Sequence, residues 1–472
     1  MLMKKLLIIG CAMAFTTGAI AQTPEPEVIE TFNCLQLSGN GEWMLGRSNT
    51  WYYQPDNAYY TETSLCNTKT GEIYGTGDLF SITPYSCPVS GKGIAMLSTY
   101  DEATNYYEVP YLVVAGQEPK MQAQFYTSGP YAGKESYSVA INDEATWFLG
   151  YYEEYPKQYP FICAINEDLT LGEPEYLEVP EKDIFGFAPY SLQLTSMSED
   201  ARTVAGSLLT STDKGRIIAY PIVYKKGDDG KWTYSYPLLG LFDLSNPEDC
   251  PTFYYFQVAL SPDGNLLACT QEKPGKVENF PDYVIWTVDL NSGIYSKIES
   301  ENTDIVATRI LDNGTVTGTF FATIRVSYIY TPGAEDFVDF VEYVSGINAD
   351  YGQWMEDNLM VKVQDYDQSG NIVETLMPDT GQVFVSDDLS VIAAGFQLSE
   401  MDKYYNFVRW SYVFTDLESS GVNASAVDSQ ASDGSVYNIH GVKVGSVKDG
   451  KFSSELAPGL YIVNGKKILI NK

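Results

Sequence analysis

The pattern of hydrophobic and polar positions repeats seven times along the chain. Each unit has an apolar strand, a Ser or Asn, a turn of two or three residues, a second apolar strand and then a small residue. The segment VALSPDGNLLACT, which starts at Val258, shows this pattern in full. Apolar strands separated by turns rich in Gly, Asn and Asp are typical of β-hairpins. The seven turns open at Ser38, Ser90, Asn142, Ser198, Ser261, Leu311 and Ser386.

The spacing between these turns predicts the fold. Successive turn-opening positions are 52, 52, 56, 63, 50 and 75 residues apart. Further strands follow each hairpin, as in residues 283–300 of the fifth unit and in the fourth unit, where a second hairpin turns at Gly227–Gly230. Four antiparallel strands per unit, repeated radially, form a β-propeller. We therefore predict an all-β, seven-bladed β-propeller over residues 22–418.

Three details of the repeat lead to further expectations. Small residues after the second strand should let neighbouring sheets approach closely. The last unit has no fourth strand after Phe407–Phe414, so we expect residues 28–32 at the other end of the chain to complete it and to remove an open sheet edge. In the 75-residue gap, residues 337–359 have apolar positions at helical spacing, which predicts one or two helices capping the sixth blade. The small residues are Gly46, Gly150, Gly206, Gly318 and Gly395.

The fifth hairpin also resembles a known motif. Its SPDGNLLA segment is similar to the S-P-D-G blade motif of TolB-type and WD-like propellers. The resemblance implies the first hairpin of a blade and no particular activity, and one unit of the seven carries the motif intact.

The C-terminal segment, residues 436–472, has short alternating strands broken by turn residues, enough for a small β-sandwich after a Ser-, Ala- and Gly-rich linker at 419–435. It resembles the type A sorting domain of the type IX secretion system of Bacteroidota over its whole length. The resemblance implies export by the type IX machinery, then release or attachment at the cell surface with loss of this domain. The residues that carry it include Gly441, Pro458, Gly459, Tyr461, Lys466 and Lys467.

The N-terminal residues 1–21 predict a secretory signal peptide. Lys4 and Lys5 precede a short apolar run, and small residues at A-x-A spacing indicate cleavage between Ala21 and Gln22. A lipoprotein box ending at Cys11 is the alternative, although only five residues separate it from Lys5. After removal of the signal we expect no transmembrane segment, and a protein that is secreted or lies on the exterior of the outer membrane of a Gram-negative bacterium.

Charge and composition narrow the possible functions. The chain has 62 Asp and Glu residues against 29 Lys and Arg, a net charge of −33. This acidity disfavours nucleic acid as a partner. The single histidine, His440, lies in the C-terminal segment, so the propeller has no histidine-based triad and no histidine-ligated zinc. We expect no cofactor. The wide cysteine spacing predicts mostly buried thiols, with at most one or two disulfide bridges.

Three groups of residues are candidates for specific chemistry. Asp365, Asp367 and Ser369 match the start of a calcium loop, but the twelfth position is Leu376 instead of Glu, and a hairpin turn explains the same residues. The 37 tyrosines include doublets such as Tyr106-Tyr107 that suit sugar stacking, although aromatic residues are also favoured in strands. Adjacent acids could suggest a glycosidase, but they lie in or beside turns. They are Glu153-Glu154, Asp228-Asp229 and Asp387-Asp388.

These observations favour a non-catalytic binding or scaffold protein over an enzyme. The expected ligand is an extracellular glycan or protein. The alternative is a secreted carbohydrate-active enzyme, a glycosidase or lyase, that uses carboxylate or tyrosine chemistry. Two facing acids in a pocket of the central channel would favour the enzyme, and an open face lined by aromatic residues would favour binding.

Overall fold

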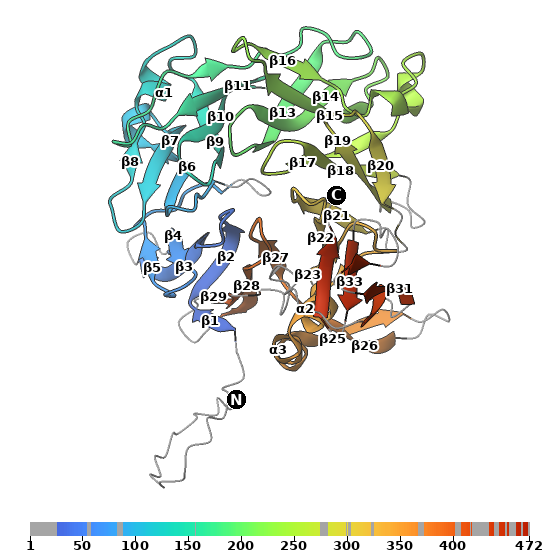
Figure 1. The fold of residues 1–472 in the computed structure, drawn as a ribbon. Coiled ribbons are helices and arrows are strands. Elements are labelled where there is room, and N and C mark those ends of the chain that lie inside the picture. Colours follow the sequence, from blue (N-terminus) through green and yellow to red (C-terminus); the bar gives the residue numbers. More distant parts are fainter. Residues whose placement is uncertain are drawn as a thin grey trace.

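Strands dominate the computed structural model of the chain, and seven small antiparallel sheets follow one another around a central axis (Figure 1). The prediction of a seven-bladed β-propeller is therefore confirmed. The structure describes residues 26–438 except 54–57, 83–87, 156, 274–281, 299, 301–303, 322–324, 367–371, 402–406, 416 and 418–433, and beyond residue 438 it describes four further strands.

Each blade is a meander in which strands that follow one another in the chain are paired. The first blade contains β2 (Phe32–Leu37), β3 (Trp43–Tyr53), β4 (Ala58–Asn67) and β5 (Ile73–Gly75). The second contains β6 (Ile94–Asp101), β7 (Tyr107–Val114) and β8 (Lys120–Met121), with the single-turn helices η1 (Glu102–Thr104) and α1 (Gln124–Thr127). The third contains β9 (Glu135–Ile141), β10 (Trp147–Glu154), β11 (Lys157–Ala164) and β12 (Glu175–Tyr176).

The next three blades repeat the arrangement. The fourth contains β13 (Pro189–Met197), β14 (Thr203–Ser211), β15 (Ile217–Lys226) and β16 (Trp232–Ser235), followed by η2 (Leu239–Leu241) and η3 (Pro247–Asp249). The fifth contains β17 (Thr252–Leu260), β18 (Leu266–Lys273), β19 (Asp282–Asp289) and β20 (Tyr295–Ile298). The sixth contains β21 (Ile305–Ile310), β22 (Val316–Phe321), β23 (Arg325–Tyr330) and β24 (Val338–Asp339).

The seventh blade takes its outer strand from the start of the propeller. Its order is β1-β29-β28-β27, where β1 is Glu27–Glu30 and the others are Phe407–Phe414, Ile392–Met401 and Gln382–Val385. In β1, Val28 pairs with Tyr412 and Ile29 with Ser411. Closure of the last blade by the N-terminal strand is thus confirmed, although Phe32 belongs to β2 of the first blade.

The seven repeated turns share one backbone geometry. In each, the N–H of the fourth residue donates to the carbonyl oxygen of the first, and the fourth residue has a left-handed φ between 52° and 83°. In four turns the opening residue is a buried serine whose hydroxyl donates to an Asp or Asn two residues later, as Ser261 does to Asp263 at 2.7 Å. The left-handed residues are Gly41, Gly93, Ala145, Ala201, Gly264, Gly314 and Leu389. The sequence pattern therefore marks a type I turn closed by a left-handed residue.

The repeated small residues play a different role from the one expected. At Gly206 a Cβ would lie 2.1 Å from the carbonyl oxygen of Gln193, which belongs to the first strand of the same blade. That first strand has a β-bulge at this point, and a bulge pushes backbone toward the partner strand. Gly46, Gly150 and Gly318 likewise face the first strand of their own blades. Only Gly395 faces a neighbouring sheet, 2.3 Å from the backbone nitrogen of Cys34, so the expectation was wrong for the other four positions.

The insertion after the sixth blade is helical, as predicted. Helix α2 (Phe340–Ile347) begins where the Asp339 carboxylate accepts the N–H of Glu342 at 2.8 Å, and α3 (Ala349–Leu359) begins at Asn348, which caps it in the same way. Such caps satisfy N–H groups that the first helical turn leaves unpaired. A hairpin follows, β25 (Met360–Tyr366) paired with β26 (Ile372–Pro378). Buried Phe340, Val344 and Met355 pack against strands of the sixth and seventh blades, so the helices cover that junction.

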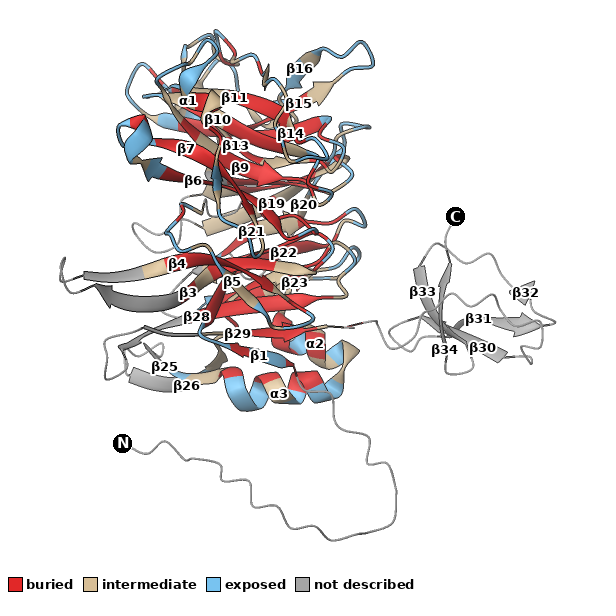
Figure 2. Ribbon diagram, turned by 90° about the vertical axis from the view of Figure 1, so that its left-hand side faces the viewer, coloured by how far each residue is buried: buried red, intermediate tan, exposed pale blue. Residues whose placement is uncertain are grey.

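The hydrophobic core lies at the junctions between blades, where the strands are most deeply buried (Figure 2). Five cysteines of the described residues are buried free thiols, in line with the expectation from their spacing; they are Cys34, Cys66, Cys163, Cys250 and Cys269. None of the helices in the described part of the chain is long and apolar enough to cross a membrane.

The C-terminal strands form one five-stranded antiparallel sheet of order β32-β31-β30-β33-β34. Their bounds are Gly434–Asn438 for β30, Lys443–Lys448 for β31, Lys451–Phe452 for β32, Gly459–Val463 for β33 and Lys466–Ile470 for β34. The short alternating strands expected there are present, and a sandwich fold for this segment stays a prediction.

The seventh blade should depend on the buried side of β1. Ile29 is 5% exposed and packs against the core between the first and last blades, whereas its neighbour Val28 is 46% exposed. We expect Ile29→Ala to lower the free energy of unfolding by about 2–4 kcal/mol, because it removes buried methyl groups, and Val28→Ala by about 0.5 kcal/mol or less. Denaturant titration of both variants measures this, and equal losses would show that β1 does not close the ring.

Candidate functional site

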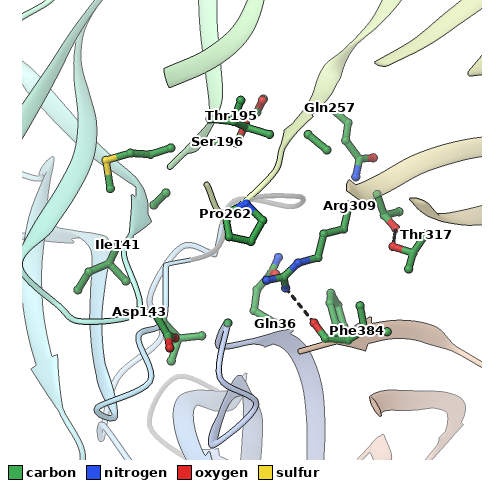
Figure 3. Close-up of a pocket in the computed structure, with 18 of the residues that line it drawn as sticks. Gln36, Ile141, Asp143, Thr195, Ser196, Gln257, Pro262, Arg309, Thr317 and Phe384 are labelled. Atoms are coloured by element: carbon green, nitrogen blue, oxygen red, sulfur yellow. Dashed lines mark hydrogen bonds between the residues drawn. The ribbon is translucent and has the colours of Figure 1, made fainter. Parts of the chain in front are cut away.

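The first hairpin turns of all blades meet around one end of the propeller axis. We call the second residues of these turns the turn ring; they are Gly39, Gly91, Asp143, Glu199, Pro262, Asp312 and Asp387. Four members line the central cavity, namely Gly39, Asp143, Glu199 and Pro262, of which Asp143 and Pro262 are labelled in Figure 3. The cavity at this end is therefore surrounded by turns and the inner strands of the blades.

Hydrogen bonds in or beside the turn ring join every blade to the next. The N–H of Gly91 donates to the carbonyl oxygen of Asp143 at 3.0 Å, and the N–H of Asp143 donates to Glu199 Oε2 at 2.7 Å. The Glu199 N–H donates to Pro262 O at 2.8 Å, which joins the fourth blade to the fifth, and the Asp263 N–H donates to Asp312 Oδ1 at 2.9 Å, which joins the fifth to the sixth. The Asp387 N–H donates to Gly39 O at 2.7 Å, which joins the seventh blade to the first, and Asn40 Nδ2 donates to Gly91 O at 3.3 Å, which joins the first to the second.

Arg309 supplies the remaining junction, between the sixth and seventh blades. Its Nη1 donates to the carbonyl oxygen of Val385 at 2.9 Å, and its Nη2 forms an ion pair with Asp387. Figure 3 shows the side chain reaching across the cavity toward the strand that carries Phe384. A partly buried guanidinium with two fixed acceptors holds both blades and gives the cavity its only cation among the described lining residues.

Two acids of the turn ring that line the cavity, Glu199 and Asp143, have raised pKa values. The pKa of Glu199 is raised to about 7, chiefly by burial and also by the negative charges of Asp143 and Asp387, whereas the hydrogen bond from the Asp143 N–H and the charge of Arg309 act to lower it. Burial likewise raises the pKa of Asp143, although the backbone N–H of Asn40 donates to its Oδ2 at 3.1 Å. A raised carboxyl pKa in a cavity is a common feature of proton-donating active sites, so Glu199 and Asp143 are the candidate acids of the channel.

The cavity is small. Its volume of about 110 Å³ has room for three or four water molecules of roughly 30 Å³ each, whereas sites for organic ligands usually measure about 300–1,000 Å³. Gln257, which is 2% exposed, lines the cavity, and neither polar atom of its side chain has a hydrogen-bond partner. The cavity is thus smaller than most sites for organic ligands and has an unpaired polar side chain in its wall.

The opposite end of the propeller carries exposed tyrosines. In an antiparallel blade, the connections from the second to the third strand lie at the end away from the first hairpin turn, and so do the connections between blades. Tyr106 is 66% and Tyr155 is 82% exposed, and Tyr155 Oη lies 3.5 Å from Tyr190 Oη of the next blade. We call Tyr100, Tyr106, Tyr107, Tyr155 and Tyr190 the tyrosine face.

Other tyrosines are buried in the hydrophobic core. Both interpretations of the tyrosines, as surface contacts and as structural strand residues, therefore apply at different positions. Tyr152, Tyr220, Tyr224 and Tyr412 are among the largest fully buried side chains. In the Tyr151-Tyr152 doublet, one ring is half-buried and stacks on Tyr137 with centroids 4.9 Å apart, while the other is buried. Tyr106-Tyr107 differs, because both of its rings are exposed.

The candidate calcium, cleavage and sorting residues found from the sequence lie in different parts of the structure or outside its described residues. Asp365 is the sixth residue of β25, whereas Asp367 and Ser369 lie outside the described residues, and the strands on either side pair as a hairpin requires. Ala21, Gln22, Gly441 and Pro458 also lie outside the described residues. Gly459 and Tyr461 lie in β33, and Lys466 and Lys467 begin β34. Among the described residues no group of three or more His, Cys, Asp or Glu side chains is arranged to hold a metal ion.

One acid of each adjacent pair has a basic partner. Glu154 pairs with Lys134 at 2.8 Å, Asp228 with Arg202 at 2.9 Å, and Asp387 with Arg309. The acids that meet in the channel, Asp143 and Glu199, were not singled out from the sequence. The signal that could have identified them is their shared place, one residue after the opening of a repeated turn.

Comparison with known proteins gives matches among solved structures only. No family profile matches the sequence, and no curated protein matches it. The similar solved structures include a putative TolB from Agrobacterium tumefaciens (15% identity, 57% of this chain and 80% of that chain, TM-score 0.33) and the β-propeller domain of the trilobed protease from Pyrococcus furiosus (11%, 81% and 93%, 0.45). An oligogalacturonate lyase from Vibrio parahaemolyticus is similar at 10% identity over 82% of this chain and 91% of that chain, with a TM-score of 0.45.

The raised pKa of Glu199 should make stability depend on pH. Because the folded-state pKa lies above the ordinary value, the stabilisation is complete below about pH 4.5 and is lost as the pH rises through about 7. Glu199→Gln should therefore match the parent protein at pH 4.5 and exceed its unfolding free energy by about 1–3 kcal/mol at pH 8. Denaturant titrations at both pH values measure this, with the exposed Glu167→Gln as control. A Glu199→Gln variant less stable at pH 8 would contradict it.

Proposed function

We propose that the propeller is a non-catalytic binding or scaffold module that acts outside the cell and holds an extracellular glycan or protein on the tyrosine face. The observation that carries the proposal is the concentration of exposed tyrosines at one end of three adjacent blades. Tyr106 and Tyr155 lie on connections between strands, and Tyr100, Tyr107 and Tyr190 lie at or next to the ends of strands β6, β7 and β13. Tyrosine offers a large rigid ring and a hydroxyl at low entropic cost, which makes it a frequent contact residue in recognition surfaces. Exposed aromatic residues grouped on one side of a soluble protein are typical of an interaction site.

The channel favours a structural role for its acids. A glycosidase needs two carboxylates with room for a sugar between them, and the cavity of about 110 Å³ has no such room. Asp143 Oδ2 and Glu199 Oε2 each accept a backbone N–H group of another blade, so these two oxygens help to hold the turn ring together. Carboxylates committed to the backbone are poorly placed to exchange protons with a substrate.

A carbohydrate-active enzyme remains the second candidate, because Glu199 has the raised pKa that a proton donor requires. Such an enzyme would need the channel to open. Its signature would be glycan turnover that Glu199→Gln abolishes, and the binding module predicts no turnover in either protein.

We also propose export by type IX secretion. A cleaved signal peptide at residues 1–21 would deliver the chain to the periplasm, and the segment 436–472 would direct it to the type IX machinery, followed by release or attachment at the surface of a Bacteroidota cell. The support is the resemblance described above, together with the alternating strands of that segment.

Truncation tests the export proposal. In the native host, removal of residues 421–472 should leave the propeller in the periplasm, because the sorting signal is lost while the signal peptide remains. Immunoblots of periplasm, outer membrane and medium measure the distribution. A truncated protein found at the surface or in the medium at parental levels would contradict the export proposal.

Substitutions on the tyrosine face test the binding proposal. Glycan-array and extracellular-protein pull-down experiments with the purified full chain should identify ligands whose affinity falls about tenfold or more in Tyr106→Ala/Tyr155→Ala, because exposed aromatic contacts dominate such surfaces. Tyr295→Ala is the control, since Tyr295 is 37% exposed and follows a turn at the other end of its blade. Equal losses in the control, or no loss in the double variant, would place the ligand elsewhere.

A further inference from the structure

Three carboxylates gather where the second and third blades meet, at the end that carries the tyrosine face. Glu108 lies near the start of β7, directly opposite Tyr100 of β6. Glu135 and Glu153 lie opposite each other on β9 and β10 of the next blade. The tyrosine-face residue Tyr100 senses the charges of all three carboxylates, which raise the pKa of its phenol in the order Glu108, Glu135, Glu153. The three acids and Tyr100 therefore form one local group.

The buried member of this group, Glu108, has one carboxylate oxygen without a hydrogen-bond partner. Glu108 is 3% exposed, and its Oε1 has no hydrogen-bond partner. Burial raises the pKa of Glu108, and the charges of Glu135 and Glu153 raise it further, although contacts with Ser81 and Tyr137 act in the opposite direction. A buried carboxylate oxygen without a partner is costly. It marks a position where a donor from another molecule would gain much by binding.

Like charges also face each other across the strand pair. Glu135 and Glu153 are register partners, and carboxylates directly opposite in a sheet destabilise it. The Tyr137 hydroxyl donates to Glu135 Oε2 at 3.1 Å. Among the described residues no Lys or Arg forms an ion pair with Glu108, Glu135 or Glu153, whereas Glu154 next in the chain pairs with Lys134. The charge of the group is thus left uncompensated.

We propose that Glu108, Glu135 and Glu153, with the ring of Tyr100, form the anchor site for a lysine or arginine side chain of a protein partner. The inference rests on the proposed binding function and selects a protein over a glycan. An ammonium or guanidinium group gains charge-assisted hydrogen bonds from carboxylates and attraction from an aromatic ring. The acidity of the whole chain, with a net charge of −33, would also attract a basic partner at long range.

The chemistry of the group favours an organic cation over a metal ion. The described residues contain no set of three or more acidic, His or Cys side chains arranged to hold a metal, which fits the placement of the carboxylates on three strands of two blades. A lysine side chain, by contrast, is long enough to reach a recessed carboxylate while its apolar stem lies against a tyrosine. The neighbouring exposed rings, Tyr106 and Tyr107, would contact the rest of the partner.

The experiment measures binding of a synthetic lysine-rich peptide to the full chain by calorimetry at low and at physiological salt. A peptide of the same sequence with glutamine in place of lysine is the paired probe. We expect the lysine peptide alone to bind, and Glu135→Gln and Glu153→Gln each to weaken it by about threefold to tenfold, as for a partly desolvated ion pair. Glu102→Gln is the matched control, because Glu102 is exposed on the same end, in η1, and makes the same change of charge.

A thermal scan of each variant separates binding from folding. Glu135→Gln and Glu153→Gln should melt at the parental temperature or above it, because each removes a like-charge pair, so a loss of binding cannot come from unfolding. Three results would overturn the site: equal binding of the glutamine peptide, an equal loss in Glu102→Gln, or Ca²⁺ binding that Glu153→Gln abolishes and that displaces the peptide. A neutral glycan that binds the tyrosine face and ignores Glu153→Gln would overturn this inference and leave the proposed function standing.

Discussion

The pairing of β1 with β29 turns a row of seven sheets into a closed ring, and the other features of the propeller depend on that closure. An open row would leave two sheet edges with unpaired backbone groups. In the closed ring the Ser411 hydroxyl, fully buried, donates to Phe32 O at 2.7 Å and accepts the N–H of Cys34 at 2.9 Å, so the last blade also holds the first through a side chain. Buried hydroxyls act in the same way at other junctions, as when Thr270 accepts the N–H of Ala307 at 3.0 Å. Because buried backbone N–H and C=O groups must be paired, these hydroxyls fix the position of each blade relative to the next.

Closure also explains why strained acids lie at the axis. Seven turns of one geometry converge there, and hydrogen bonds link the second residues of several of them, as between Asp143 and Glu199. Glu199 and Asp143 accept backbone N–H groups that no strand can pair at this position, and Arg309 balances part of the resulting charge. A raised pKa is often taken as a sign of catalysis. In this cavity burial among the converging turns is the main cause of the raised pKa of Glu199 and Asp143, and the backbone N–H groups that they accept act in the opposite direction.

Much of the fold could be predicted from the sequence because it rests on local turn chemistry. Ser261 and Asp263, with the left-handed Gly264, specify a turn without reference to distant residues, and seven such turns at near-even spacing specify the propeller. Non-local features were harder to predict. The β-bulge opposite Gly206 and the meeting of Asp143 with Glu199 from different blades arise from tertiary packing. The tyrosines could be counted from the sequence. That Tyr106 and Tyr155 are exposed at the same end of the propeller is known only from the structure, because it depends on the order of strands within each blade.

The two ends of the propeller differ in how regular they are, and the proposed binding site lies at the irregular end. At the turn ring, hydrogen bonds in or beside the repeated turns join six of the junctions between blades, and Arg309 joins the seventh. At the other end the connections vary in length and composition, and Glu108 and the Glu135–Glu153 pair have no compensating cation in the described residues. A folded chain tolerates such uncompensated charge only where the stability of the rest of the structure is sufficient. The closed ring supplies that stability, so the regular end of the propeller permits the irregular end to keep a charged, aromatic surface.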